Sequence, residues 1–236
     1  MKIKNAILDL LFPRICPFCN TPYTIDSWSC NCDYRQYLIE ESKNKKGLKN
    51  TEGVRLLCVD KAVAIYYYKG NTKKAIVRLK QGEENSILVF SHQLAQFIKD
   101  YLPVDKIQYI CTIPKTAREE QRQPINHLHC ICKAVASQLS IPYIPVLEKI
   151  YETDRQHNLS KLERSANLLG AFEVKDKFRP HVKGKNALII DDVLTTGGTM
   201  SECAKILKIR GAQQVYACTV ALTPHDNSIT KSKKEI

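Results

Sequence analysis

The fold is decided by residues 187–200, ALIIDDVLTTGGTM. Four apolar residues lead into the adjacent acids Asp191 and Asp192, and a loop of threonines and glycines then opens a second periodic segment. We expect a buried strand, a loop and a helix, with the two acids at the carboxyl end of the strand, where sheets of this kind bind ligands. Carboxylates there can accept hydrogen bonds from sugar hydroxyls, while the glycines and the helix N-terminus favour a phosphate. An ordinary strand–turn–helix without a ligand is the alternative.

The segments around this stretch alternate between strand-like and helix-like patterns. Apolar runs predict strands over residues 62–68, 107–113, 143–147, 186–190 and 214–222. Amphipathic periodicity predicts helices over residues 70–80, 86–101, 126–139 and 199–210. Such alternation is typical of an α/β fold whose mainly parallel sheet carries helices on both faces.

The composition is that of a folded, basic protein. The chain has 236 residues, of which 44% are apolar, and 36 Lys and Arg against 24 Asp and Glu, which gives a net charge of +12. This apolar content excludes disorder as the dominant state. The longest apolar runs, such as residues 62–68, are shorter than the roughly 18 residues of a membrane-spanning helix. Asp9 interrupts the apolar stretch near the N-terminus, so we expect no export signal and a cytoplasmic protein.

The positive charge indicates a polyanionic partner such as nucleic acid, a membrane surface or a phosphorylated substrate. Part of it is concentrated in two clusters, Lys43, Lys45, Lys46 and Lys49 in one, and Lys231, Lys233 and Lys234 in the other. Short basic runs are also typical of solvated linkers and tails, which is what we expect of the second cluster. For the first cluster both interpretations stay open.

Four of the ten cysteines lie close together near the N-terminus: Cys16, Cys19, Cys30 and Cys32. In a reducing compartment such clusters more often bind metal than form disulfides. Four thiolates complete a tetrahedral site with no open position, so a zinc ion there would be structural. The first pair has the usual C-x2-C spacing and the second is a tighter C-x-C, which leaves unligated thiols as the alternative. We expect the other six cysteines to be small, buried core residues.

These features divide the chain into four parts. We expect residues 1–40 to hold a short helix and the four-cysteine knuckle, and residues 41–53, which are polar and basic, to form a linker. Residues 54–224 then form the α/β domain, and residues 225–236 a flexible basic tail.

Residues 187–200 resemble the phosphoribosyl pyrophosphate (PRPP) motif of the type I phosphoribosyltransferases. The resemblance implies the mainly parallel, helix-flanked sheet of that family. It also implies that Asp191 and Asp192 hold the 2′- and 3′-hydroxyls of the ribose. The 5′-phosphate would be held by the loop residues Thr195, Thr196, Gly197, Gly198 and Thr199.

Further segments resemble the ComF family of competence-linked, amidophosphoribosyltransferase-like proteins (ComFC-like). They are the cysteine knuckle, Tyr68-Lys69-Gly70, Arg78-Leu79-Lys80 with Gly82, Arg122, Asn126, Gln156, Leu159, Arg164, Asn167 and Gly170-Ala171-Phe172. The similarity spans about residues 11–222. It implies that the segment after the strand at 107–113 forms a pyrophosphate-side loop. In that loop Lys115 and Arg118, with Arg122 close behind, would neutralise a departing pyrophosphate.

One run departs from the family pattern. Where the family usually has Arg-Arg-Gly-aromatic-Asn-Gln, this chain has residues 122–127, RQPINH. Pro124 cannot adopt a positive φ and lacks an N–H, so the loop must differ in shape. The last residue of the run, His127, and the nearby His129 lie beside two cysteines. Because residues so close on a helix face different sides, we expect ordinary helix histidines rather than a second metal site.

The resemblance implies several functions. As a competence protein, the chain would take up or handle single-stranded DNA during natural transformation, with the competence helicase and recombination-mediator proteins as partners. Its place would be the cytoplasm or the inner face of the cytoplasmic membrane. As a phosphoribosyltransferase, it would use Mg²⁺ with PRPP and transfer the phosphoribosyl group to an unidentified nitrogen acceptor. A PRPP-sensing regulator without catalysis is the third alternative. We favour the competence role with a ribose-phosphate ligand, and the sequence leaves turnover of PRPP open.

Overall fold

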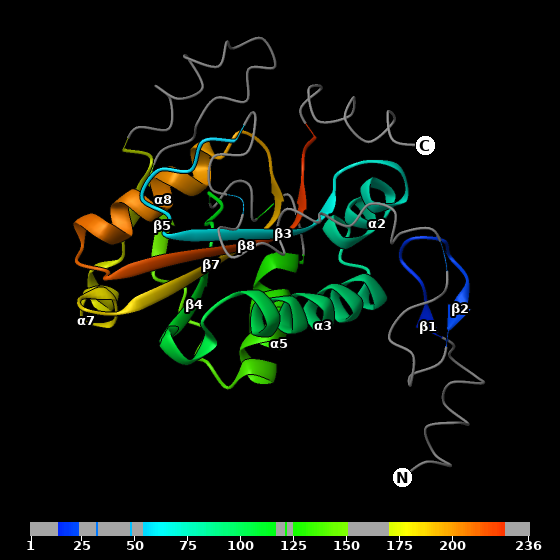
Figure 1. The fold of residues 1–236 in the computed structure, drawn as a ribbon, viewed down its shortest axis with the longest axis horizontal. Helices are drawn as coiled ribbons and strands as arrows, with labels where there is room; N and C mark the ends of the chain where they lie inside the picture. Colours follow the sequence, from blue (N-terminus) through cyan, green and yellow to red (C-terminus); the bar gives the residue numbers. More distant parts are fainter. Residues whose placement is uncertain are drawn as a thin grey trace, which may run out of the picture.

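The computed structural model describes residues 14–23, 32, 48, 54–116, 121, 125–150 and 170–224. Its centre is a four-stranded parallel sheet in the order β3-β8-β7-β4 (Figure 1). The strands are β3 (Lys61–Tyr67), β4 (Tyr109–Thr112), β7 (Asn186–Leu194) and β8 (Gln214–Leu222). The mainly parallel sheet expected from the sequence is confirmed.

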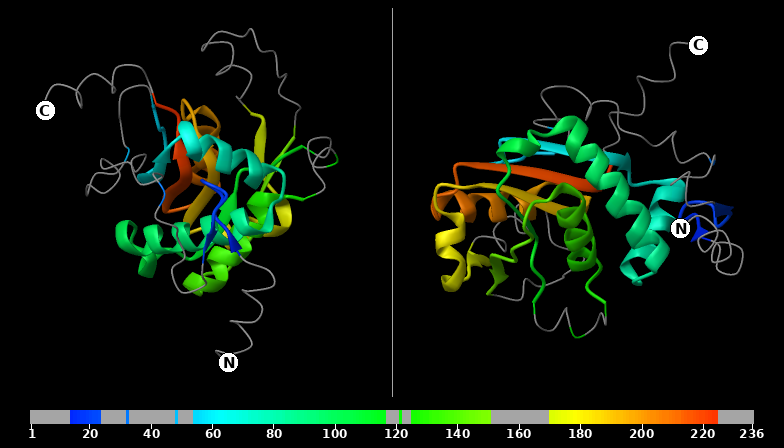
Figure 2. Two further views of the ribbon diagram at one scale, coloured as in Figure 1. Left: turned by 90° about the vertical axis from the view of Figure 1, so that its right-hand side faces the viewer. Right: turned by 90° about the horizontal axis from the view of Figure 1, so that it is seen from below.

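The helices cover both faces of this sheet (Figures 1 and 2). They are α2 (Gly70–Lys80), α3 (Glu84–Tyr101), α5 (His127–Leu139), α7 (Arg179–Val182) and α8 (Gly198–Ile209), with the short 3-10 turns η4 (Val104–Lys106) and η5 (Asp176–Phe178). α2, α3 and α5 share one apolar core with the sheet, and α7 and α8 share a second core on the opposite face.

The central strand β7 supplies side chains to both cores. Residues 186–190 of this strand are all buried, as parallel strands covered by helices on both faces are. Because successive side chains of a strand point to opposite faces, Leu188 and Ile190 pack in the core of α2, α3 and α5, and Ala187 and Ile189 in that of α8. The apolar run that predicted this strand is therefore explained by burial on two sides.

The end of β7 differs from the prediction. The strand continues beyond Ile190 through the acidic pair to Leu194, because Asp191 and Val193 still lie in register with β8. The acids therefore belong to the strand itself, at the carboxyl end of the sheet, rather than to the loop that follows it.

The strand expected at residues 143–147 is also different. Tyr143 makes a single parallel bridge to Ile110 of β4. A separate antiparallel ribbon then pairs β5 (Leu147–Lys149) with β6 (Phe172–Val174), which no sequence pattern predicted.

The N-terminal knuckle includes an antiparallel ribbon of β1 (Arg14–Ile15) and β2 (Pro22–Tyr23). In Figure 1 it lies beside α2. Phe18, in the turn between the two strands, is 4% exposed and packs edge-to-face against Tyr66 and Phe90, with ring centroids 5.4 and 5.5 Å away. The described part of the knuckle thus shares a core with the α/β domain.

Leu48 is the one residue of the expected linker, 41–53, that the structure describes. It is buried, and its N–H donates to the carbonyl of Ala62 on β3 across 2.7 Å. The expected helix at residues 5–12, both lysine clusters and the tail lie outside the described residues. Within the described ranges, none of the helices combines the length and apolar character that crossing a membrane requires.

Candidate functional site

The candidate site lies at the carboxyl end of β7, between β8 and β4. Asp191 and Asp192 are consecutive in the strand, so their side chains point to opposite faces of the sheet. Asp192 lies on the side of α2 and α5 and is 8% exposed, whereas Asp191 lies on the side of α8 and is partly exposed. The two carboxyl groups therefore flank the end of the strand.

Two side chains from other elements hold Asp192. The Nε2 atom of His127, the first residue of α5, lies 2.9 Å from Oδ2 of Asp192. The Nζ atom of Lys80, the last residue of α2, lies 3.2 Å from the same oxygen. A carboxylate this deeply buried needs such partners, because its desolvation is otherwise too costly.

The surroundings shift the pKa values of Asp191 and Asp192 in opposite directions. Burial, and then the charge of Asp192, raises the pKa of Asp191 to about 8, although Lys80 and Lys115 act in the opposite direction. Burial also acts to raise the pKa of Asp192, but the hydrogen bond from His127 and the charge of Lys80 outweigh it and keep that pKa below its ordinary value. At neutral pH the pair therefore carries one proton and one negative charge.

The loop after β7 presents hydroxyl groups beside the N-terminus of α8. Thr195 and Thr196 are exposed, whereas Gly197 is buried and has a φ of +87°, which glycine adopts most readily. A Cβ atom on Gly197 would lie 2.9 Å from the carbonyl oxygen of Arg55 and 2.9 Å from the Leu56 side chain. Gly197 therefore has a packing role against residues 55–56, which the sequence did not indicate.

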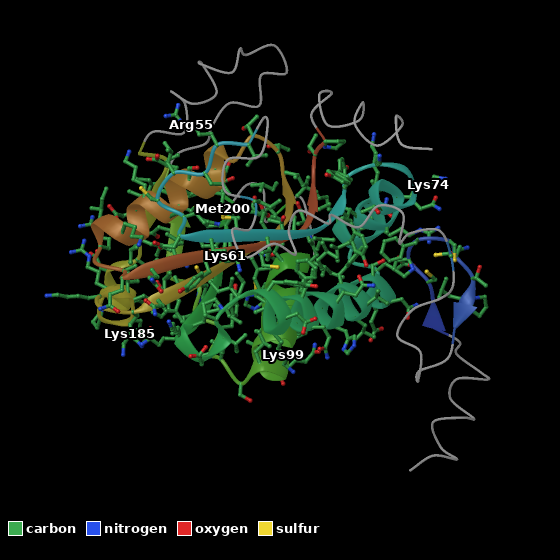
Figure 3. All side chains as sticks on the ribbon, viewed as in Figure 1. Arg55, Lys61, Lys74, Lys99, Lys185 and Met200 are labelled. Atoms are coloured by element: carbon green, nitrogen blue, oxygen red, sulfur yellow. The ribbon has the colours of Figure 1, made fainter. Side chains whose placement is uncertain are left out.

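Residues 55–57 brace this loop and the start of α8. The N–H of Arg55 donates to the Thr196 carbonyl across 3.2 Å. The Ser201 hydroxyl donates to the Arg55 carbonyl across 3.2 Å and accepts from the Leu57 N–H at 3.0 Å. Arg55 and Met200 of α8 lie on the same side of β3 in Figure 3. This bracing fixes the loop beside the first turn of α8, whose N–H groups lack partners within the helix.

The segment after β4 approaches the acidic pair from the other neighbouring strand. The Thr112 hydroxyl donates to the Ile190 carbonyl across 2.9 Å, which ties the ends of β4 and β7 together. Lys115 follows, and its charge acts to lower the pKa of Asp191. The structure therefore brings Lys115 near the acids, while Arg118 and Arg122 lie outside the described residues.

Sequence reasoning assigned no role to Lys80 or His127. The available signal was indirect: a carboxylate expected at the end of a buried strand requires a donor or cation, but spacing does not say which one. Both residues lie at helix ends, α2 closing at Lys80 and α5 opening at His127. Only the fold shows that these two ends meet the same oxygen of Asp192.

The structure brings three of the four predicted zinc ligands together. The Sγ atoms of Cys16, Cys19 and Cys32 lie within 4.8 Å of one another, and those of Cys16 and Cys32 are 3.9 Å apart. A tetrahedral ion with Zn–S bonds of about 2.3 Å separates its sulfurs by about 3.8 Å, which the Cys16–Cys32 distance matches, and Cys19 is close enough to join the same ion. Cys30 lies outside the described residues.

The remaining cysteines are not all buried, as the sequence led us to expect. Burial raises the pKa of the four that are fully enclosed and keeps them as neutral core residues: Cys111, Cys132, Cys203 and Cys218. Cys130 is half-buried and Cys58 is exposed. The expectation is wrong for Cys58, which follows residues 55–57 in a left-handed conformation with a φ of +62°.

We predict one zinc ion per chain, held by Cys16, Cys19, Cys32 and the fourth expected ligand, Cys30. Changing any of these residues to serine should lower the zinc content of anaerobically purified protein, because one thiolate ligand is lost. Elemental analysis measures the content. Cys203→Ser, a change in the core under α8, is the matched control and should keep a full complement. Substoichiometric zinc in the parent protein would contradict the site.

The raised pKa of Asp191 predicts a pH-dependent effect on stability. Because its folded-state pKa of about 8 exceeds the ordinary value of 3.8, this carboxyl contributes stability at low pH that is lost as the pH rises through about 8. Asp191→Asn cannot ionise, so its free energy of unfolding relative to the parent should rise by about 2 kcal/mol between pH 5 and pH 9, allowing for partial exposure. Urea unfolding at both pH values measures this. Asp100→Asn, on the exposed surface of α3, should show no such trend, and an equally flat difference for Asp191→Asn would disprove the prediction.

Comparison with known proteins finds a family match that includes the candidate site. Residues 130–235 match the model of the phosphoribosyl transferase domain family, and this segment contains the acidic pair, the loop and α8. The DNA utilization protein YhgH of Salmonella typhi is 32% identical over 115 residues, 48% of this chain and 49% of that protein. A ribose-phosphate pyrophosphokinase of Gloeobacter violaceus is 57% identical over 37 residues, 16% of this chain and 11% of that protein. This chain spans about half the length of the YhgH proteins that it matches.

Among solved structures, adenine phosphoribosyltransferase from Saccharomyces cerevisiae is similar at 15% identity, over 65% of this chain and 77% of that chain, with a TM-score of 0.41. Residues 130–235 are thus similar to the phosphoribosyl transferase domain family, and the acidic pair and the loop lie inside that matched segment.

Proposed function

We propose that this chain binds a ribose 5-phosphate group, as in PRPP, at the carboxyl end of β7. The observation that carries the proposal is that the protein's own contacts engage one oxygen of each carboxyl group. Asp191 accepts from the Asp192 N–H through Oδ1, at 2.9 Å, and Asp192 meets His127 and Lys80 through Oδ2. Within the described residues nothing hydrogen-bonds to Oδ2 of Asp191 or to Oδ1 of Asp192. One oxygen of each acid is thus left for one of two vicinal ribose hydroxyls.

The phosphate end of the ligand would lie on the loop. Thr195 and Thr196 offer exposed hydroxyls, and the twelve-residue helix α8 directs its N-terminus at the same place. Gly198 and Thr199 belong to its first turn, where backbone N–H groups lack helix partners and the helix dipole favours an anion. Sugar acceptors and phosphate donors therefore follow one another along the chain, in the order that a ribose 5-phosphate requires.

A catalytic phosphoribosyltransferase is the second candidate, and the position of Lys115 favours it. This lysine lies near enough to Asp191 for its charge to act on that carboxyl, and it would neutralise the pyrophosphate as it leaves the ribose. Arg118 and Arg122 would add charge to the same loop, and PRPP would arrive with its Mg²⁺. The C1–O bond to pyrophosphate would then break, pyrophosphate would be released, and the acceptor nitrogen would bond to C1 of the ribose and lose its proton to solvent. A PRPP-sensing regulator would use the same pocket without that step.

For the biological role we propose a ComF-type competence protein that handles single-stranded DNA. Three observations support it: the resemblance to the ComF family along most of the chain, the DNA utilization relatives, and the net charge of +12. Competence helicase and recombination-mediator proteins would be its partners, in the cytoplasm or at the inner face of the membrane. The exposed lysines Lys74, Lys99 and Lys185 are spread over the described surface (Figure 3), so the undescribed cluster at residues 43–49 is the better candidate for a local DNA contact.

Replacing both acids by their amides should weaken binding of PRPP and of ribose 5-phosphate. The double variant Asp191→Asn/Asp192→Asn keeps side-chain size but removes the negative charge of Asp192, and with it a charge-assisted hydrogen bond of about 1.5–3 kcal/mol. Calorimetric titration with each ligand measures the loss, and circular dichroism checks the fold. Asp100→Asn should bind like the parent. A folded double variant with undiminished affinity would show that the loop is an ordinary turn.

Binding of single-stranded DNA should depend strongly on salt. Each neutralised phosphate contributes about −0.7 to the slope of log K against log salt, because condensed counterions are released. Neutralising Lys43, Lys45, Lys46 and Lys49 should flatten this slope more than neutralising the same number of scattered lysines, Lys74, Lys99, Lys177 and Lys185. Fluorescence anisotropy with an oligonucleotide measures both slopes. Affinity that does not change between low and moderate salt would rule out phosphate contacts as the basis of binding.

A further inference from the structure

His127 makes a deeply buried contact with the acidic pair. Its side chain is 2% exposed, and its Nε2 atom lies 2.9 Å from Oδ2 of Asp192. The position of His127 is fixed by the helix it begins: the Asn126 side chain caps α5 by accepting from the N–H of His129 across 3.2 Å. The ring is therefore held rigidly against the carboxylate.

The second nitrogen of the ring indicates where its proton lies. Nδ1 of His127 is buried, and no described residue hydrogen-bonds to it. A proton on that nitrogen would bury an unpaired N–H, which is costly. The arrangement with least cost is a neutral ring that carries its proton on Nε2 and donates to Asp192. His127 then supplies one directional N–H.

Lys80 meets the same oxygen in a different way. Its side chain is 41% exposed, and an ammonium on a flexible stem fixes no direction. Asp191 and Lys115 are the other ionisable groups near this contact. Of the two groups that contact Oδ2, only His127 is rigid enough to set the rotation of the carboxylate and so the direction of its other oxygen, Oδ1.

We propose that His127 is a positioning residue that turns Oδ1 of Asp192 toward a ribose hydroxyl and so makes the site select sugar phosphates over phosphate alone. The inference rests on the proposed ribose-phosphate site. It adds a residue outside the acidic pair and the phosphate loop, contributed by α5. Its effect passes through Asp192, and His127 itself does not touch the ligand.

The test compares two ligands, ribose 5-phosphate and inorganic phosphate, by titration of the full chain. His127→Leu fills the buried space without a donor. It should weaken ribose 5-phosphate about tenfold, since hydrogen bonds to charged groups carry about 1.5 kcal/mol or more, and leave inorganic phosphate unchanged. His127→Gln keeps a neutral N–H donor and should restore most of the preference. His129→Ala is the control and should match the parent, because Nδ1 of His129 meets the Tyr143 hydroxyl at 3.1 Å.

A second comparison separates positioning from a general effect on folding. In an Asp192→Ala background, where no side-chain oxygen remains to be turned, His127→Leu should cause no further loss of ribose 5-phosphate affinity. Additive losses would overturn the inference. So would a folded His127→Leu protein that keeps the parent's preference for ribose 5-phosphate, and so would equal losses for both ligands. A parent protein without any preference for ribose 5-phosphate over phosphate would remove the proposed function itself, and the inference with it.

Discussion

Asp192 is a buried carboxylate, and the carboxyl edge of the sheet is organised around its need for partners. A charge at 8% exposure is tolerated only when donors or cations compensate for the lost water. His127 and Lys80 meet this need, and in doing so they bring the start of α5 and the end of α2 to the end of β7. Three elements that are distant in the sequence are thereby fixed at one point. In our proposal the free oxygen of Asp192, Oδ1, owes its direction to this contact, whereas Asp191 is held separately by the N–H of Asp192.

Local patterns predicted the elements that local physics controls. β8 occupies residues 214–222 and α2 residues 70–80, as expected, because an unbroken apolar run and an amphipathic period are each sufficient to specify such elements. β7 was predicted too short. From the sequence alone, two adjacent acids look like the end of an apolar strand. The register with β8 shows that the strand continues, because Asp191 pairs with Thr219. The sequence shows only whether each residue is polar, whereas the backbone hydrogen bonds to β8 determine where the strand ends.

The parts of the site that escaped prediction depend on contacts between distant segments. No spacing rule relates Lys80 or His127 to Asp192, because only the packing of two helices on one sheet face joins them. From the sequence, Gly197 was expected to let the backbone approach a phosphate. In the structure its missing Cβ also leaves room for the backbone of Arg55. In the knuckle, by contrast, the cysteines themselves were enough to predict a metal site, because thiolates are typical zinc ligands. Thiols at C-x2-C spacing are brought to zinc-like separations by a short turn, so three of the four expected ligands meet.

A crystal structure of the full chain with ribose 5-phosphate bound tests the central claim most directly. We predict the phosphate on the loop of residues 195–199 and the two vicinal hydroxyls on Oδ2 of Asp191 and Oδ1 of Asp192, with the contact between His127 and Oδ2 of Asp192 kept. A sugar phosphate bound at another part of the surface, or one whose hydroxyls point away from both acids, would contradict it.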